Sequence, residues 1–302
     1  MDSLFNVVEI ARKRRIHPRA MRPIKSNISI EAEYYGILRE IVSEIRKRFT
    51  NLAVETMSRP RTKEQWQDAA PYDKTLDKVV DKIIEQIRKK YHSKRLELLI
   101  KKMFLKADKY QSAKFRRAVE YGFGFKIDDL PEFKAYKPFI NSVIKKNLEI
   151  IENLRDDTLY KTSLALRTAV AQGSSIKQVQ TAIMSTGEVG KKRAALIART
   201  EIKNVVSALN EKRAISAGFS TYIWLTANDE RVRGNPSGKY PANKSINRHD
   251  NHYIMNGLLC RYGNDNVYSS DGGKTWQKRT SKMPLTFPGQ AIMCRCVDFA
   301  QN

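Results

Sequence analysis

Apolar residues at helical spacing dominate this chain from residue 31 onward, and they limit the folds that it can adopt. Along the first such stretch they recur at steps of three and four, so they lie on one face of a helix. These residues are Tyr34, Leu38, Ile41, Ile45, Phe49 and Leu52. The same spacing returns in residues 76–103, 139–171 and 191–217. Because each helix must bury its apolar face against another element, the pattern predicts a body of long packed helices.

The character of the sequence changes after Gly218. Tyr222–Leu225 is typical of a strand, and Ala291–Phe299 is a candidate final strand. Glycine, proline, asparagine and serine are frequent in residues 228–251, which indicates loops. We therefore expect an α+β fold, with a mainly helical N-terminal body and a small mixed α/β C-terminal module.

One hairpin turn is predicted within this module. Residues 269–276 read Ser-Ser-Asp-Gly-Gly-Lys-Thr-Trp and resemble the Asp-box hairpin of sialidases, where the motif recurs once per propeller blade. Here the motif occurs once, so it indicates a turn and not sialidase chemistry. Asp271 is expected to accept backbone hydrogen bonds within the turn, and Trp276 is expected to pack beneath it.

Three segments are expected along the chain. Prolines near the N-terminus break any helix there, so residues 1–30 are predicted to form a basic extended arm. Thr186-Gly187 is predicted to turn the chain. Residues 31–190 then form the helical body, and residues 191–302 form the α/β module.

The chain carries a large excess of positive charge. Its 56 lysines and arginines against 32 aspartates and glutamates give a formal net charge of +24. A polyanion is therefore the expected partner, with double-stranded DNA ahead of an anionic membrane surface. The tightest basic run, Arg12-Lys13-Arg14-Arg15, is a candidate nucleic-acid contact, and the alternative is a solvated tail.

Two classes of protein are not expected. The longest uncharged run, Ala214–Asn228, is too short and too polar to span a bilayer. The first residues lack a charged segment followed by an apolar core, so no secretory signal is expected. The three cysteines do not suggest a disulfide framework, and a reducing compartment is the simpler interpretation.

Two histidines and two cysteines near the C-terminus form a candidate metal site. His249, His252, Cys294 and Cys296 offer two imidazoles and two thiolates, a donor set that suits a structural Zn²⁺ ion holding the C-terminal strand. The Cys-x-Cys spacing is tighter than in a standard zinc finger. The alternative is a pair of buried thiols beside a loop, with hydrogen-bonded or exposed histidines.

A hydrolytic site is the second chemical possibility. Glu201, Asp229 and His252 could supply an acid, a base and a metal ligand for a nuclease. No zinc-protease, serine-hydrolase, phosphate-loop or dinucleotide-binding motif is present, so we expect no enzymatic activity. A structural role for Glu201 is favoured, in which it bonds to a strand or pairs with Arg231 or Arg233.

Several polar and glycine residues recur in a fixed order through the last third of the chain. They are Ile197-Ala-Arg199-Thr200-Glu201, Asn204, Asn210, Trp224, Asp229-Glu-Arg231-Val-Arg233, His252, Asn256-Gly257, Pro288-Gly289 and Cys294-Arg295-Cys296. With these marks, residues 194–302 resemble the Mu F-like domain of phage head-morphogenesis proteins, also called minor head or minor capsid proteins. Arg22–Tyr34, Asn147–Ile151 and Gly173–Ile176 look like upstream parts of the same family.

The resemblance implies a low-copy protein of a tailed-phage procapsid that associates with the portal vertex during head assembly. The implied partners are the portal protein, the scaffold or the major capsid protein. The implied location is the phage head, after assembly in the host cytoplasm. A positive surface suits a place beside packaged DNA, because each neutralised phosphate releases counterions. No cofactor is expected apart from the zinc ion considered above.

Two other functions stay open at this stage. One is a nuclease or other hydrolase carried in the head, which would use Glu201, Asp229 and His252. The other is a generic nucleic-acid-binding protein, whose binding would weaken steeply with salt and which would not bind phage structural proteins. Base-specific recognition is not expected, since no helix-turn-helix, zinc-finger or RNA-recognition signature is present.

Overall fold

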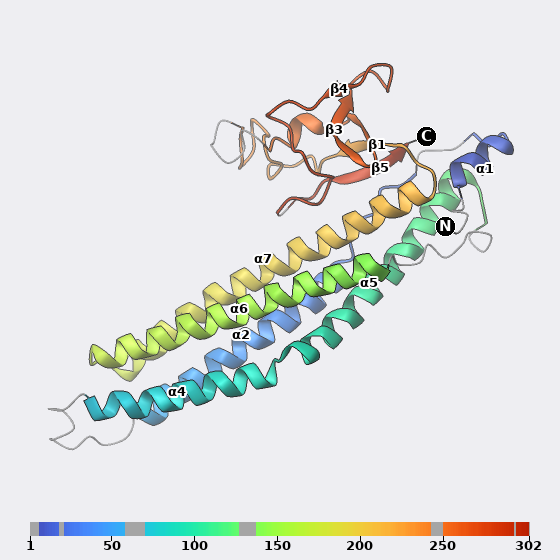
Figure 1. Ribbon diagram of the computed structural model, residues 1–302. Coiled ribbons are helices and arrows are strands. Elements are labelled where there is room, and N and C mark those ends of the chain that lie inside the picture. The colour runs from blue at the N-terminus through green and yellow to red at the C-terminus, as the bar shows by residue number, and fades with distance from the viewer. Residues whose placement is uncertain are drawn as a thin grey trace. The chain divides into compact units, whose positions relative to one another are not determined.

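The computed structural model describes residues 6–17, 21–57, 70–126, 137–242, 250–292 and 294–301. Its helices are α1 (Val7–Lys13), α2 (Ile28–Met57), α4 (Ala70–Lys90), α5 (Ser93–Phe123), α6 (Lys137–Ala171), α7 (Ile176–Ser216) and the 3-10 helix η3 (Tyr253–Met255). Its strands are β1 (Thr221–Leu225), β2 (Leu259–Arg261), β3 (Asn264–Ser269), β4 (Gln277–Lys278) and β5 (Val297–Gln301). Figure 1 shows this order, which confirms the predicted α+β fold class.

The chain divides into two compact units. The first, which we call the helical unit, comprises Ser29–Phe104 and Ile140–Arg199. The second, which we call the sheet unit, comprises Met1–Ile28, Leu105–Phe139 and Thr200–Asn302. The predicted boundary between residues 190 and 191 falls inside α7. None of the described helices is long and apolar enough to cross a membrane.

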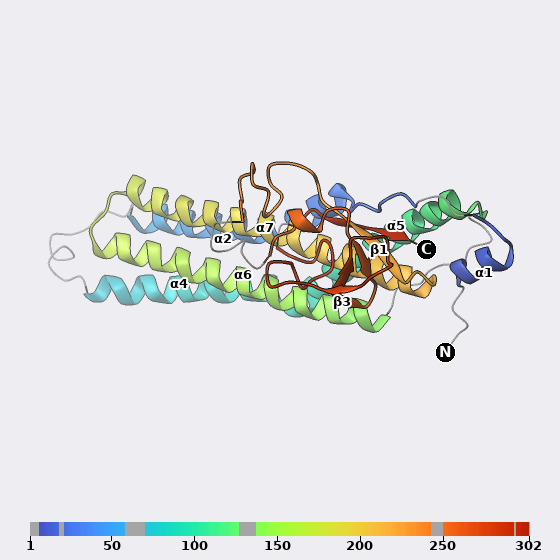
Figure 2. The same ribbon diagram turned by 90° about the horizontal axis from the view of Figure 1, so that it is seen from above.

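Long helices pack along their apolar faces in the helical unit. α2, α4 and α6 lie side by side in both views (Figures 1 and 2). Every apolar residue predicted for the first helix face is buried in α2. The Tyr34 hydroxyl in this core donates to Asn147 Oδ1 on α6 at 2.7 Å, so the polar groups buried with the face are paired.

α7 is continuous where a turn was predicted. The prediction that Thr186-Gly187 turns the chain is wrong, because α7 is one helix of 41 residues. A Cβ at Gly187 would lie 2.9 Å from the Arg46 side chain, and one at Gly190 would lie 2.9 Å from Val42. Both neighbours are on α2. These glycines therefore allow two helices to approach closely, and do not break the helix that contains them.

The N-terminal arm is helical over part of its length. The prediction of an extended arm is wrong for Val7–Lys13, which forms α1. Asn6 caps this helix, since its side-chain oxygen accepts from the backbone nitrogen of Glu9 at 2.8 Å. The helix buries Val7, Val8 and Ala11 in an apolar cluster of the sheet unit. Apolar residues one and four positions apart were enough to form a buried stripe on this short helix.

The sheet unit contains one antiparallel sheet with the strand order β4-β3-β2-β1-β5. β1 pairs with β2 on one side and with β5 on the other, so it lies inside the sheet. Tyr222 and Trp224 on β1 are fully buried, in a cluster that also contains Cys260, Phe287, Cys294 and Cys296. The strand predicted at Tyr222–Leu225 is confirmed, while the final strand begins later than predicted, at Val297.

The predicted hairpin turn is confirmed between β3 and β4. Asp271 Oδ1 accepts from the Thr275 backbone nitrogen at 3.0 Å, and its Oδ2 accepts from the Thr275 hydroxyl at 2.6 Å. The Ser269 hydroxyl donates to Asp271 at 2.6 Å. These bonds hold the pKa of Asp271 far below its usual value. The turn is therefore fixed locally by three side chains within seven residues of sequence.

Candidate metal centre

Three side chains from the predicted metal set meet in the interior of the sheet unit. His252 Nδ1 lies 3.3 Å from Cys296 Sγ and 3.4 Å from Cys294 Sγ. The three residues are 2%, 6% and 7% exposed in the order His252, Cys294, Cys296. Among the described residues, this is the one group of three or more His, Cys, Asp or Glu side chains whose ligand atoms all lie within 4.8 Å. His249 lies outside the described residues.

Distant segments bring these ligands together. His252 immediately precedes η3, whereas Cys294 and Cys296 lie just before β5, 42 and 44 residues later. β5 is held against β1 along five paired positions, from Thr221↔Gln301 to Leu225↔Val297. Trp224 of β1 covers the His252 ring edge to face, with ring centroids 5.5 Å apart. The sheet therefore places the two cysteines beside the histidine.

Asp250 orients the histidine. Its Oδ1 lies 2.8 Å from His252 Nε2, so Nε2 carries the proton when the ring is neutral and Nδ1 faces the two sulfurs as an acceptor. The second oxygen of Asp250 pairs with Arg233, whose guanidinium also donates to the Ile292 carbonyl. Arg233 thus fixes Asp250, and Asp250 fixes the orientation of the His252 ring.

The charges in the cluster depend on one another. Burial alone would lower the pKa of His252, but its hydrogen bonds to Asp250 and Cys294 raise that pKa to about 9. The hydrogen bond from Cys296, followed by that from His252, holds the pKa of Cys294 well below its usual value. The same contact with Cys294, together with burial, raises the pKa of Cys296. The cluster therefore favours one thiolate beside an imidazolium, a strongly polar arrangement in a buried site.

A second polar link joins the same loops. Arg295, between the two cysteines, forms a two-pronged ion pair with Asp229. Asp229 Oδ1 also accepts from the backbone nitrogen of Arg231 at 2.9 Å, which shapes the loop after β1. The pair lowers the pKa of Asp229. Arg233, one of the two arginines considered as a partner of Glu201, forms an ion pair with Asp250.

α7 is tied to the loop that precedes the cysteines. The end of the Asn204 side chain faces the carbonyl oxygens of Gly289 and Gln290 at 3.1 and 2.8 Å, so its amide nitrogen is the donor there. The Ser207 hydroxyl donates to the Pro288 carbonyl. Gly289 has φ +87°, and a Cβ there would lie 3.1 Å from Ser207 Cβ. Glycine is therefore required both by the backbone conformation and by the closeness of α7.

The remaining marks occupy separate positions. Arg199 Nε donates to Glu31 at 3.1 Å within the helical unit. Thr200 and Glu201 are buried on α7 in the sheet unit. Gly257 has φ +84°, and its backbone nitrogen donates to the Trp224 carbonyl at 2.8 Å. None of these residues is a member of the cluster.

The residues proposed for a nuclease do not form a ligand group in the described part of the chain. His252 belongs to the cysteine cluster, Glu201 and Asp229 are not in that group, and Asp229 is paired with Arg295. Sequence reasoning missed two other contributors. One is Asp250, for which an acidic residue two positions before a candidate ligand histidine was an available signal. Arg279 lies 5.4 Å from the Trp224 ring centroid and donates to the Pro284 carbonyl at 2.7 Å.

The basic run near the N-terminus is exposed on and after α1. Lys13 forms an exposed ion pair with Glu9 at 2.7 Å. The Arg14 guanidinium lies 5.8 Å from the Phe125 ring centroid. Arg12 and Arg15 are also exposed. At least two of the four cations therefore have contacts within the protein.

A comparison with known protein families gives a match in the later part of the chain. Residues 161–298 match the family described as Phage Mu protein F like protein. The match contains every mark from Arg199 to Cys296 and confirms the resemblance over this part of the chain. Arg22–Tyr34 and Asn147–Ile151 lie outside the matched residues.

The chain is also similar to one curated protein over most of its length. An uncharacterized protein of Haemophilus influenzae is 23% identical over 294 residues, covering 96% of this chain and 61% of the relative. The chain therefore spans about three fifths of that protein's length. No solved structure matches.

Proposed function

We propose that this chain is a minor head protein that joins the procapsid at the portal vertex, stays in the phage head and contacts packaged DNA. The observation that carries the proposal is the family match over residues 161–298. Several of the marks inside this match meet where α7, the loop after β1 and the segment before β5 are linked by polar contacts. These links fix the fold of the matched part of the chain, on which the proposed assembly role depends.

The exposed side of α5 supports the proposed DNA contact. Its exposed cations outnumber its exposed acidic residues, Glu97 and Glu120. The cations are Lys94, Arg95, Lys101, Lys102, Lys106, Lys109, Lys114 and Arg117. A row of positive charge of this kind attracts the phosphate backbone without reading the base sequence.

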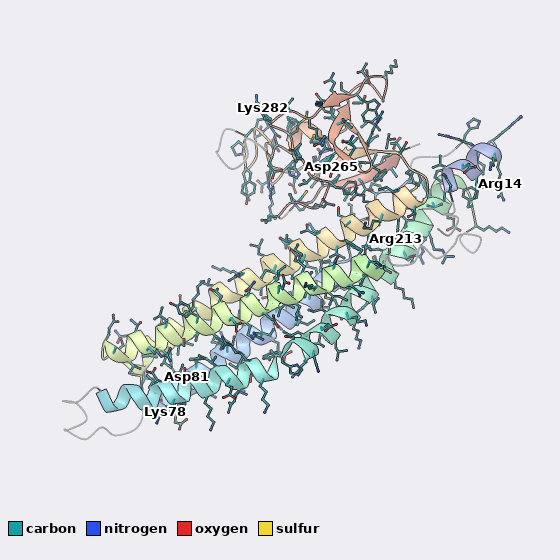
Figure 3. All side chains as sticks on the ribbon, in the orientation of Figure 1. Arg14, Lys78, Asp81, Arg213, Asp265 and Lys282 are labelled. Atoms are coloured by element: carbon teal, nitrogen blue, oxygen red, sulfur yellow. The ribbon has the colours of Figure 1, made fainter. Side chains whose placement is uncertain are left out.

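The exposed side of α4 offers a contrast within the same chain. Asp77, Asp81 and Glu85 are interspersed there with exposed lysines, including Lys78 and Lys82. Figure 3 labels Lys78 and Asp81, which both project from α4. Because the two signs nearly balance, this surface should attract DNA much less than α5 does.

The proposed role involves no catalysis. What supports this is the burial of the His252 cluster, which leaves little room for a substrate, and the separate pairing of Asp229. The expected outcome is that the purified chain does not cut DNA or RNA with added Mg²⁺, Mn²⁺ or Zn²⁺. Cleavage that disappears in His252→Ala would favour the nuclease instead.

The portal contact is tested by co-purification. The chain is used to capture the portal protein encoded beside it, at low and high salt, with and without nuclease treatment. Retention at high salt after nuclease treatment is the expected result, because a direct protein contact does not depend on DNA. Loss of the portal protein under nuclease treatment would contradict the portal role.

The DNA contact is tested by two matched triple variants. Lys101→Gln, Lys102→Gln and Lys109→Gln together remove three charges from α5, and Lys78→Gln, Lys82→Gln and Lys89→Gln together remove three from α4. We expect the α5 variant to lower DNA affinity at least about tenfold more than the α4 variant and to flatten the salt dependence. Equal losses in the two variants would show that net charge alone accounts for binding.

A further inference from the structure

We propose that His252, Cys294 and Cys296 bind one zinc ion, which fastens the segment before β5 to the loop before η3. The proposal does not depend on the portal or DNA role, since it concerns the folding of the sheet unit. Two thiolates and an imidazole form a soft donor set that suits zinc in a four-coordinate site. Among the described residues, these three side chains are the donors that meet there, and they would supply three of the four ligands.

The distances between the donor atoms fit this ion. Tetrahedral zinc, with Zn–N of about 2.0 Å and Zn–S of about 2.3 Å, holds its nitrogen and sulfur ligands about 3.5 Å apart. The two observed separations from His252 Nδ1 are 3.3 Å to Cys296 Sγ and 3.4 Å to Cys294 Sγ. The histidine nitrogen therefore already has the spacing from both sulfurs that one shared ion requires, and all three donor atoms lie within 4.8 Å of one another.

The residues around the donors also suit a metal ligand. Asp250 binds the histidine nitrogen that faces away from the sulfurs, at 2.8 Å, as carboxylates do behind ligand histidines in zinc sites. The Lys203 ammonium group lies 3.4 Å from the Cys294 carbonyl, and the Cys296 backbone nitrogen lies 3.4 Å from Cys294 Sγ. The backbone N–H of Cys296 stabilises negative charge on the Cys294 sulfur in a site that solvent hardly reaches.

Burial indicates that the ion has a structural role. All three ligands are less than a tenth exposed, and Trp224 and Met255 lie in the same apolar cluster. A catalytic zinc ion needs an open position that a substrate can approach. Here the ion would instead join segments more than 40 residues apart, next to strands of only two to six residues. Structural zinc contributes folding energy directly where the apolar core is small.

The experiment measures zinc in the full chain, expressed in zinc-supplemented medium and dialysed under reducing conditions without chelator. Elemental analysis is expected to find about one zinc per chain. The double variant Cys294→Ser with Cys296→Ser should lose the metal. Cys260→Ser is the matched control, because Cys260 is buried in the same unit but lies outside the ligand group, and it should keep the metal.

A second measurement avoids variants that fail to fold. Wild-type protein is emptied with a chelator and reloaded with Co²⁺, which reports tetrahedral geometry by intense visible absorption bands and thiolate ligands by near-ultraviolet charge transfer. Asp250→Asn should keep these bands but lower metal affinity about 10-fold to 100-fold. Two results would overturn the proposal: wild-type protein without zinc and without the cobalt bands, or loss of zinc in Cys260→Ser equal to that in the double variant.

Discussion

The helical unit and the sheet unit are held together in different ways. In α2, nine buried residues form one continuous apolar face along 30 residues of helix. In the sheet unit, β1 has five residues and β4 has two. The strands there are joined by polar links between distant loops, including the Asp229–Arg295 pair and the His252 cluster. The contrast teaches that specific long-range links become important where the elements are too short to bury much apolar area.

The two units also differ in how their charges are used. Ion pairs in the helical unit, such as Arg167–Asp77 and Arg193–Asp157, join side chains that are about one third to one half exposed and contribute little to stability. In the sheet unit, Arg213 and Asp108 form a buried pair. Breaking such a pair by removing one partner leaves a buried charge uncompensated. This charge pair of the sheet unit is therefore part of its interior.

The largest expected effect is that removing the metal destabilises one unit and not the other. A strong chelator is expected to destabilise the sheet unit by on the order of 5–10 kcal/mol, somewhat less than in zinc fingers that fold only with metal. The helical unit contains no part of the cluster and should be unaffected. Hydrogen exchange measured on peptides should show faster exchange in β1 and β5 but not in α2. Equal changes in both units, or none in either, would contradict the comparison.

The next effect concerns Trp224, which covers the metal-site histidine. Trp224→Ala is expected to lower the stability of the sheet unit by about 3–5 kcal/mol, because it leaves a cavity between His252 and Arg279. Trp276→Ala is the matched control on the partly exposed hairpin, where less packing is lost, and it should cost less than half as much. Urea unfolding followed by hydrogen exchange measures both. A similar cost for the two variants would weaken the view that packing concentrates at the cluster.

Truncating one buried apolar side chain in the helical unit should lower the stability of that unit and leave the sheet unit unchanged. Leu38→Ala is expected to cost about 2–4 kcal/mol, since Leu38 is fully buried on α2. Leu98→Ala, where the side chain is 70% exposed, serves as the control and should change stability by less than about 0.5 kcal/mol. Zinc content should remain unchanged in both variants. Loss of zinc in Leu38→Ala would mean that the two units depend on each other for folding.

The smallest expected effect depends on pH. Burial, followed by the neighbouring carboxylates Asp265 and Asp298, raises the pKa of Glu211 to about 7, against a weaker opposing effect of Lys212. The folded state therefore binds this proton more tightly than the unfolded state, and stability falls as pH rises from about 4.5 to about 7. Glu211→Gln removes this loss.

At pH 8 the Glu211→Gln variant should be more stable than wild type by about 1–2 kcal/mol after solvent screening, and at pH 4 the two should be equal within about 0.5 kcal/mol. Unfolding by urea at several pH values measures this difference. Asp265 and Asp298, whose pKa values burial also raises, keep part of the pH dependence in the variant. A difference that does not change between pH 4 and pH 8 would show that Glu211 does not titrate as proposed.

Local patterns explain the parts that sequence reasoning predicted. The apolar steps in α2 and the Ser269–Thr275 turn were predictable because each depends on neighbours within one helix or one turn. The α1 helix was not predicted because prolines follow it closely in the sequence, although none lies within its short apolar stripe. The continuity of α7 was missed because Thr186-Gly187 also matches a turn signal, and only the closeness of Gly187 to α2 explains this glycine.

Of the candidate site, the sequence by itself determined the chemistry: two thiols, an imidazole and a basic chain whose later part is matched to Mu F-like proteins. Only the tertiary structure decided which groups meet. In the folded chain Cys294 and Cys296 lie beside His252, and Asp250 orients the histidine ring. Asp229 pairs with Arg295 and does not join a nuclease site. The physical reason is that helix faces and turns follow from near neighbours, whereas contacts across 40 or more residues depend on strand pairing and packing that no local pattern specifies.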